Sequence, residues 1–384
     1  MNNRKSEQKS EQLPENRKLK AVITGGGTGG HIYPALAIAQ GLKEVMGAEI
    51  LYLGGKDTME NRLAPLAGFK FSPVDCRGLQ GLSWQSIKAL YHNLKGQKEA
   101  KIILQAFTPD IVIGTGGYVA APVVLAAAAL GIPSMIHEQN AFPGKANRLL
   151  SRKVDRVCLT FTAAGKHFPA KSKMTLTGLP VRQEILLAQR EASLQKLGLR
   201  DDKPVFLITG GSQGARTIND AVVPAMEELL AAGLQVVHIT GPKNYASVRQ
   251  KLAKTGVFDY KGLILLPYLD KIESALAAAD LVLARAGASF LSEMLCRGLP
   301  GILIPYPYAA GNHQEENARS LQEAGAALII KDNCLNKESL LAHVLFLLKD
   351  RQKLTEMSAA ARALAMPDAL DNILKIAEEL IKNK

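Results

Sequence analysis

The tetrapeptide Ile-Thr-Gly-Gly occurs twice in the chain, at residues 23–26 and 208–211, each time at the end of a short apolar run. Each copy opens a glycine-rich turn that leads into a helical pattern, GGGTGGHIYPALA in the first half and GGSQGARTINDAV in the second. Backbone N–H groups at such strand-to-helix turns hold phosphate oxygens well. The repeat therefore predicts one fold unit used twice, with two phosphorylated ligands.

Strand-like and helical segments alternate along almost the whole chain. This alternation predicts the α/β class, with parallel sheets covered by helices on both faces. Ligands of such domains bind beyond the carboxyl ends of the strands, so the active site is expected in the cleft between the halves. The predicted strands are 20–24, 49–53, 110–113, 134–137, 156–159, 204–209, 235–240, 262–266, 281–284, 301–305 and 326–330.

A chain of 384 residues is long for one core and comfortable for two domains. We expect a disordered polar tail at 1–18, a first domain at 19–178 and a second at 179–365. The segment 366–384 is predicted to be an amphipathic helix that can pack back on the first domain. The apolar stretch 119–136 is broken by Pro122, Gly131 and Pro133, which favours a buried helix and a strand over a membrane span.

The positive charge is concentrated in the first half of the chain. The net charge is +12, and residues 1–178 hold 23 lysines and arginines against 12 acidic residues. This asymmetry predicts an acidic partner: nucleic acid, an anionic membrane or a phosphorylated substrate. Nucleic acid is disfavoured because aromatic residues make up only 5% and no nucleic-acid-binding motif is present. The four cysteines form no CxxC pair, as expected for a reduced cytoplasmic protein.

The glycine run alone does not identify the ligand. The Walker pattern is absent, and although Gly25, Gly27 and Gly30 fit GxGxxG, the next strand ends without an acidic residue for a ribose hydroxyl. A nicotinamide dehydrogenase is therefore poorly supported. His31 follows the run at the start of a helix, where the macrodipole favours the neutral base form, although a capping or packing histidine is the alternative. No Asp-x-Asp occurs, so no metal is expected in catalysis.

Seven motifs occur in order along the chain: GGGTGGHIYPALA, GTGGYVAAP, HEQNAFPGKAN, GLPVR, GGSQGARTIN, RAGASFLSE and NHQEENA. Together they resemble the MurG family of bacterial peptidoglycan N-acetylglucosaminyltransferases, from about Leu19 to the end. The resemblance implies the GT-B architecture, two facing Rossmann-like domains with parallel sheets and an interdomain cleft. It also implies inverting transfer of GlcNAc from UDP-GlcNAc to the 4-hydroxyl of undecaprenyl-diphosphate-MurNAc-pentapeptide (lipid I), giving β-1,4-linked lipid II, without a cofactor.

The resemblance implies a donor site mostly on the second domain. Ser212 and Arg182 would hold the diphosphate, Glu293 the ribose, a backbone group of Leu269 the uracil, and Gln314 the transferred sugar. The remaining residues expected at UDP-GlcNAc are Thr28, Gly29, Gly30, Asn140, Ala288, Ser289, Phe290, Leu291 and Ser292. Leu179 and Phe290 depart from the family pattern, which commonly has asparagine and a small hydroxyl residue there.

On the first domain the resemblance implies an acceptor site and a general base. His31 is the first choice for the base that deprotonates the muramoyl 4-hydroxyl, with Glu138 second. The residues expected on the acceptor side are Gly26, Gly27, Gly116, Gly117, Tyr118, His137 and Asn147.

The resemblance further implies a peripheral protein on the cytoplasmic side of the cell membrane, with contacts to other cell-wall synthesis proteins. Residues 78–101 suit an anionic bilayer surface, although an ordinary surface helix is equally compatible with the pattern. The apolar and basic residues of this segment are Leu79, Leu82, Trp84, Ile87, Leu90, Tyr91, Leu94, Lys88, Lys95, Lys98 and Lys101.

Three alternatives remain open at this stage. Another GT-B enzyme, such as a diacylglycerol galactosyltransferase or a UDP-GlcNAc 2-epimerase, shares the nucleotide side but is disfavoured by HEQNA and GGYV. A nicotinamide oxidoreductase lacks its acidic ribose residue. A non-enzymatic nucleotide-binding scaffold would have the fold without a working base.

Overall fold

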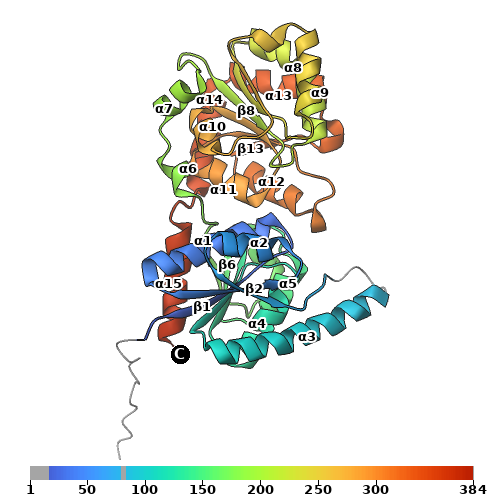
Figure 1. Cartoon of the computed structure of the whole chain (residues 1–384). Helices are drawn as coiled ribbons and strands as arrows, with labels where there is room; N and C mark the ends of the chain where they lie inside the picture. Colours follow the sequence, from blue (N-terminus) through green and yellow to red (C-terminus); the bar gives the residue numbers. More distant parts are fainter. Residues whose placement is uncertain (1–16, 79–83, 384) are drawn as a thin grey trace, which may run out of the picture.

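The computed structural model describes residues 17–78 and 84–383, which form two α/β domains stacked end to end (Figure 1). The expected disordered tail lies outside these residues except for Arg17 and Lys18. Arg17 pairs with Asp110 at 2.7 Å, beside the start of the first sheet.

The first domain is built on a parallel sheet of seven strands in the order β3-β2-β1-β4-β5-β6-β7. The strand order reverses between β1 and β4, which is where ligands bind in doubly wound sheets. The strands are β1 (Lys20–Thr24), β2 (Glu49–Gly55), β3 (Lys70–Val74), β4 (Ile111–Gly114), β5 (Ser134–Glu138), β6 (Arg156–Leu159) and β7 (Met174–Leu176). The helices are α1 (Gly29–Met46), α2 (Met59–Leu66), α3 (Trp84–Phe107), α4 (Ala120–Ala129), α5 (Lys145–Leu150) and the 3₁₀ turn η1 (Thr162–His167).

The second domain repeats this plan with six parallel strands in the order β10-β9-β8-β11-β12-β13. The strands are β8 (Val205–Thr209), β9 (Gln235–Ile239), β10 (Leu263–Leu266), β11 (Leu281–Ala284), β12 (Gly301–Leu303) and β13 (Ala327–Ile329). The helices are α6 (Gln183–Leu187), α7 (Arg190–Leu197), α8 (Arg216–Ala231), α9 (Tyr245–Lys254), α10 (Ile272–Ala278), α11 (Ala288–Cys296), α12 (His313–Glu323), α13 (Lys337–Lys349) and α14 (Arg351–Leu364). The 3₁₀ turns are η2 (Val257–Asp259), η3 (Ala310–Asn312) and η4 (Asp332–Cys334). The predicted α/β class is confirmed.

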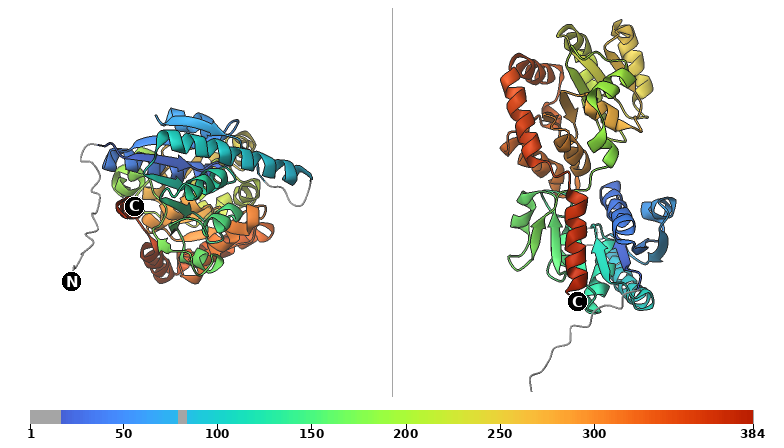
Figure 2. Two further views of the ribbon diagram at one scale, coloured as in Figure 1. Left: turned by 90° about the horizontal axis from the view of Figure 1, so that it is seen from below. Right: turned by 90° about the vertical axis from the view of Figure 1, so that its left-hand side faces the viewer.

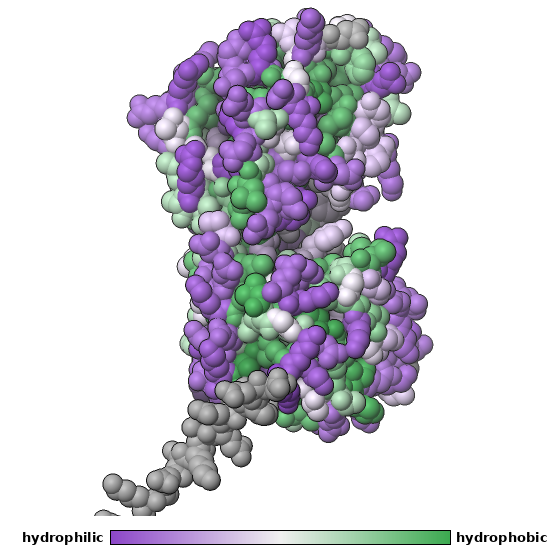
Figure 3. All heavy atoms as spheres, turned by 60° about the vertical axis from the view of Figure 1, so that its left-hand side comes forward, coloured by the Kyte–Doolittle hydropathy of each residue, from purple (hydrophilic) through white to green (hydrophobic). Residues whose placement is uncertain are grey.

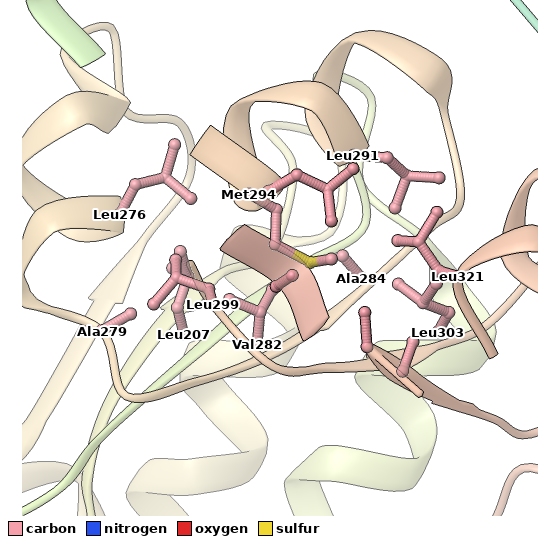
Figure 4. Packing of buried hydrophobic residues seen from close by; sticks show 14 of the residues in the cluster. Leu207, Leu276, Ala279, Val282, Ala284, Leu291, Met294, Leu299, Leu303 and Leu321 are labelled. Carbon is pink, nitrogen blue, oxygen red and sulfur yellow. The ribbon is translucent and has the colours of Figure 1, made fainter. Parts of the chain in front are cut away.

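Helices bury apolar residues against both faces of each sheet. One core of the second domain joins Leu207 and Val282 of the sheet to Leu291 and Met294 of α11 (Figure 4). In the first domain, α4 lies in a core with β1 and β4, as expected of the buried apolar stretch that begins at Val119. Among residues 17–78 and 84–383, no helix is both long enough and apolar enough to cross a bilayer.

The last helix, α15 (Ala369–Lys382), returns to the first domain. It lies between α1 and the strands that end the first sheet (Figure 2). Ile373 and Ala377 are fully buried in the same core as Ile38 of α1 and Ile113 of β4. The chain therefore crosses between the domains twice, at Gly178–Pro180 and again ahead of α15.

The domains leave a hollow between them on the outer surface (Figure 3). Beside the crossing points lies a cavity of about 370 Å³, lined by small and apolar residues of both domains that include Phe161, Leu179, Leu295, Leu321 and Met366. None of the residues of the two glycine-rich loops lines this cavity, so it belongs to the hinge. Gly178 has φ +80° and a Cβ there would meet Met366 at 2.5 Å, so a side chain cannot be accommodated.

Candidate functional site

The first glycine-rich loop, residues 25–30, joins β1 to α1 at the point where the strand order reverses. Gly26 N–H donates to the Gly116 carbonyl at 3.4 Å, and Gly27 N–H donates to the carboxylate of Glu60 at 3.3 Å. The N–H groups of Thr28, Gly29 and Gly30 have no partner among the described residues. The N-terminus of α1 thus offers three adjacent donors, whereas Gly26 and Gly27 use theirs to fix the loop.

Glu60 of α2 supports this loop through a hydrogen bond, a role that the sequence does not reveal. Its side chain is fully buried and also accepts from Gly55 N–H at 3.1 Å. A Cβ on Gly26 would lie 2.3 Å from this carboxylate. Gly26 is therefore required by close packing against Glu60.

The loop after β4 closes on the first loop. Gly117 has φ +78°, and a Cβ there would lie 2.2 Å from the Gly26 carbonyl oxygen. A Cβ on Gly116 would lie 3.1 Å from Nδ1 of His31, so glycine makes room for the imidazole. Tyr118 is half-buried beside Gly27, and burial raises the pKa of its phenol.

His31 stands in the first turn of α1 with its imidazole held from one side. Nδ1 lies 3.0 Å from the Thr115 carbonyl and 2.9 Å from Oε1 of Gln139. Both partners are oxygens that only accept, so Nδ1 carries the proton. The other ring nitrogen, Nε2, has no hydrogen-bond partner among the described residues, and its lone pair is available to take a proton.

Glu138 is placed differently from His31. It ends β5 and is buried, and its carboxylate accepts from Asn140 N–H at 2.9 Å, Gly144 N–H at 3.2 Å and Asn147 Nδ2 at 2.9 Å. These bonds hold the loop between β5 and α5 in shape. The Glu138 carboxylate is therefore occupied by donors of its own loop, whereas Nε2 of His31 has no partner among the described residues.

His137 is fully buried within β5, behind the loops. Its Nε2 lies 2.7 Å from the carbonyl oxygen of Gly178 at the hinge, and Nδ1 lies 3.1 Å from the Gln139 amide. Burial lowers the pKa of His137 to about 4, so the ring is neutral. Buried Asn147 donates to the His137 carbonyl, so both residues support the loops from inside the domain.

The second glycine-rich loop, residues 210–214, joins β8 to α8 in the second domain. Gly211 N–H bonds Thr209 Oγ1 at 3.2 Å and Gly214 N–H bonds the Gly211 carbonyl. Ser212 is exposed, and its N–H and hydroxyl have no partner among the described residues. This loop therefore presents free donors ahead of a helix N-terminus, as a phosphate site requires.

Arg182 and Glu293 form an ion pair, with Nη2 and Nε of Arg182 at 3.1 and 3.2 Å from one carboxylate oxygen. Arg182 precedes α6 beside the hinge, and Glu293 lies on α11. The Glu293 side chain is 13% exposed. Burial raises the pKa of Glu293, and Arg182 partly opposes this rise.

The other residues expected at the donor lie in α11, at the start of α12 and between β10 and α10. Ser289 is exposed in the first turn of α11, whereas Ala288, Leu291 and Ser292 are buried and Phe290 is half-buried. Leu269 packs against the core beside exposed Tyr268. Gln314 of α12 accepts from Tyr306 N–H at 3.0 Å, which fixes its side chain at the start of the helix.

Asn317 of α12 connects the domains directly. Its Oδ1 accepts from Ala141 N–H at 2.7 Å, and its Nδ2 lies 3.2 Å from Asn140 Oδ1 and 3.1 Å from the Ala286 carbonyl. Asn317 is fully buried. Asn140, expected at the transferred sugar, is thus held by the second domain. The sequence placed Asn317 in a motif but did not indicate this bridge.

Within the described ranges, no group of three His, Cys, Asp or Glu side chains is arranged to hold a metal ion.

Comparison with known proteins follows the domain division. The glycosyltransferase family 28 N-terminal domain matches residues 21–159, and the family's C-terminal domain matches residues 205–373. A UDP-N-acetylglucosamine–N-acetylmuramyl-(pentapeptide) pyrophosphoryl-undecaprenol N-acetylglucosamine transferase of Desulforamulus reducens is 46% identical over 368 residues, covering 94% of this chain and 99% of the relative. A protein of the same name from Desulfitobacterium hafniense is 48% identical over 362 residues, covering 93% and 98%.

Solved structures with the same fold agree with these sequence matches. The crystal structure of Acinetobacter baumannii MurG is 32% identical, with a TM-score of 0.78 over 94% of this chain and all of that one. A putative UDP-N-acetylglucosamine 2-epimerase from Listeria monocytogenes, 18% identical with a TM-score of 0.68, shares the fold over 96% of this chain and 98% of that one. Two matching domain models, and relatives matched over nearly their whole length, show that this chain belongs to glycosyltransferase family 28 and, within it, to the MurG family of N-acetylglucosamine transferases.

Proposed function

We propose that this protein transfers GlcNAc from UDP-GlcNAc to the 4-hydroxyl of lipid I with inversion, giving β-1,4-linked lipid II. The observation that carries the chemistry is the imidazole of His31. Its Nδ1–H is held by two carbonyl-type oxygens, which leaves Nε2 as a base at the start of α1. His31 stands beside the free N–H groups of Thr28, Gly29 and Gly30.

In the proposed reaction, Nε2 of His31 takes the proton of the muramoyl 4-hydroxyl as its oxygen forms a bond to C1 of GlcNAc. The bond from C1 to the diphosphate oxygen breaks on the opposite face, and UDP leaves with the electron pair. The α8 N-terminus, with Ser212 and the charge of Arg182, stabilises the negative charge on UDP. The free N–H groups of the first loop bind the acceptor diphosphate and the donor sugar.

Donor binding, in this proposal, separates the ion pair at the hinge. Arg182 turns to the diphosphate, and Glu293 accepts from the ribose hydroxyls. The partial exposure of Arg182, 51% of its side chain, supports such a movement because the guanidinium is already open to solvent. Gln314 and Asn140 then bond the sugar hydroxyls, and a backbone group of Leu269 reads the uracil.

We further propose that the first domain rests on the anionic cytoplasmic face of the membrane through α3. This helix runs along the outer side of the domain (Figure 1). Leu90, Tyr91 and Leu94 are more than half exposed, and exposed Lys88 and Lys98 lie near them. Such a face suits an anionic interface. The expected contributions of Leu79 and Leu82, and of the Trp84 and Ile87 side chains, lie outside the described residues.

The test is transfer from labelled UDP-GlcNAc to a lipid I analogue by purified protein. We expect labelled disaccharide product with wild type, and a fall in kcat of about 10²- to 10⁴-fold for His31→Ala with donor KM nearly unchanged, because general-base catalysis contributes that much. Unchanged turnover of His31→Ala would remove the histidine from the mechanism. Conversion of UDP-GlcNAc to its C2 epimer without acceptor would instead indicate an epimerase.

A further inference from the structure

One side chain beside the proposed base has no part in the function described so far. Gln139 follows β5, is 2% exposed, and its side chain makes three contacts within hydrogen-bond distance. The side chain lies between the imidazoles of His31 and His137. We infer that Gln139 is the positioning residue that fixes the tautomer and orientation of His31. This inference rests on the proposed role of His31 as the base.

The contacts determine which way the Gln139 amide points. Its Nε2 lies 2.9 Å from the carbonyl oxygen of His137, which can only accept, so the amide nitrogen must stand there. The amide oxygen therefore faces His31, at 2.9 Å from Nδ1. An oxygen without a proton requires Nδ1 of His31 to be the donor.

The contacts of His137 require the same orientation of the Gln139 amide. Its Nε2 lies 2.7 Å from the Gly178 carbonyl, so Nε2 carries the proton and Nδ1 is left as an acceptor for the Gln139 amide at 3.1 Å. The hydrogen bonds thus run in one direction, from His31 to Gln139, to His137, to the hinge peptide. The carbonyls of Thr115, His137 and Gly178 make the opposite direction impossible.

A glutamine supplies this orientation without a charge. A carboxylate at the same place would stabilise the imidazolium form of His31, because the site is buried and the interaction is weakly screened. It would also face the His137 carbonyl oxygen without a proton to donate. The neutral amide holds the ring through Nδ1–H without adding a charge that would favour the imidazolium form, and it leaves Nε2 free of contact with Gln139.

The other ionisable groups around His31 do not substitute for this control. The Glu60 carboxylate accepts from the N–H groups of Gly27 and Gly55, and the Glu138 carboxylate accepts from N–H groups of the loop after β5. Burial raises the pKa of Tyr118, after β4, and lowers that of His137, so both are neutral near pH 7. Among the described residues, Gln139 is therefore the side chain that hydrogen-bonds the His31 imidazole.

The experiment compares Gln139→Leu and Gln139→Glu with the wild-type enzyme. We expect Gln139→Leu to lower kcat by about 10- to 100-fold with donor KM within about threefold, which corresponds to losing one or two hydrogen bonds in the transition state. We expect Gln139→Glu to move the acidic limb of the kcat/KM profile to higher pH. Nitrogen-15 NMR of labelled histidine should show the Nδ1–H tautomer for His31 in wild type and a mixture in Gln139→Leu.

Gln235→Leu is the matched control. Gln235 is also a buried glutamine, 3% exposed, whose amide bonds Arg200 and Lys203 far from the site. It should lose similar stability while keeping the pH profile, the tautomer and kcat. If Gln139→Leu behaves like this control, Gln139 is only structural and the inference is overturned.

The tautomer measurement separates this inference from the proposed function. Wild-type protein showing Nε2–H at His31 would refute the role of Gln139 even if the transferase is active. The protein could instead fail to transfer GlcNAc while wild type shows the Nδ1–H tautomer and Gln139→Leu disturbs it. That result would refute the proposed function but support the positioning role of Gln139. If Gln139→Leu does not fold, Gln139→Glu and the wild-type spectrum decide.

Discussion

In the proposed mechanism, Arg182 and Glu293 would serve two states of the enzyme, one without donor and one with donor bound. Without donor they neutralise each other, and burial favours the protonated form of Glu293 while Arg182 favours the ionised form. If ionised Glu293 accepts from the ribose, then Arg182 acts on the donor in two ways, through the diphosphate and through the charge of Glu293.

Replacing Arg182 with methionine should therefore change both the strength and the pH dependence of UDP binding. We expect the Kd to rise by about tenfold or more at pH 7.5, because a charge-assisted hydrogen bond contributes about 1.5–3 kcal/mol. Without Arg182, burial is unopposed and the pKa of Glu293 rises further. Affinity should then begin to fall at a higher pH on acidification than in wild type.

Calorimetric titration of UDP at several pH values measures both effects. Arg200→Met is the control, since Arg200 bonds Asp202 on an exposed turn before β8. Equal pH profiles for wild type and Arg182→Met would show that Glu293 ionisation does not limit binding.

The loop amides mark the limit of residue-level prediction from sequence. The sequence indicates two phosphate-binding loops. It does not reveal that the N–H groups of Gly26 and Gly27 are hydrogen-bonded to other residues of the protein. The buried position of Glu60 could not be predicted from the sequence, because an acidic residue in a short helix normally points to solvent. Gln139 stands inside a noticed motif, but its importance comes from carbonyls at Thr115 and Gly178 that only the folded sheet brings near.

At the scale of elements, the strands found from sequence are those with buried apolar runs. All six strands of the second sheet and five of the first coincide with predicted ranges within two residues at either end. The two missed strands, β3 and β7, are the edges of the first sheet. Edge strands bury little, and β3 contains Pro73 while all of β7 is exposed, so neither carries the expected apolar pattern.

Strand β9 should make stability depend on pH. His238 is fully buried, its Nε2 bonds Asn219 Oδ1 at 2.9 Å, and burial lowers its pKa to about 3. Between this value and the ordinary 6.5, the unfolded chain binds more protons than the folded one. The free energy of unfolding should thus fall as the pH drops below 6.5, by up to about 1.4 kcal/mol per pH unit from this residue.

Urea unfolding of His238→Phe at several pH values tests this. The variant should lose part of the acid sensitivity and keep the part due to His137, whose pKa is also lowered. Val237→Ala, in the same strand, should be less stable at every pH with an unchanged slope. If the unfolding free energy of His238→Phe depends on pH as steeply as that of wild type, His238 is not a source of the acid sensitivity.

Helix α3 should bind membranes by charge as well as by apolar contact. Lys95 is paired with Asp75 and Glu99, and Lys88 and Lys98 are exposed near Leu90 and Leu94. The double change Lys88→Glu and Lys98→Glu should weaken binding to anionic vesicles by about tenfold or more, since each lysine near the surface contributes about 1 kcal/mol.

Sedimentation with vesicles of anionic and of neutral lipid measures this. Lys254→Glu with Lys349→Glu, exposed lysines of the second domain, is the control with the same total charge. Equal binding of wild type to both kinds of vesicle would remove the electrostatic part of the proposal.

For the whole molecule, Asn317 makes a buried polar contact that couples the domains. Asn317→Leu leaves the Ala141 N–H without its acceptor, which should cost about 1–3 kcal/mol of stability. Loss of the bridge should also widen the range of domain separations, seen as a larger radius of gyration in small-angle scattering. Transfer activity should fall because the sites lie on different domains.

Asn219→Leu provides the comparison, since Asn219 is a buried asparagine whose bonds stay within the second domain. It should lose stability without changing the radius of gyration. If Asn317→Leu leaves the scattering curve unchanged, the domains are held by other contacts.

The return of α15 to the first domain has a consequence for biosynthesis. Ile373 and Ala377 complete a core begun by strands near the N-terminus, so that core stays open on one side until α15 has emerged from the ribosome. The second domain, by contrast, has its whole sheet and its covering helices before α15 emerges. The second domain can thus finish folding first. The first domain cannot complete its core until α15 is available, and until then it is exposed to chaperones and proteases.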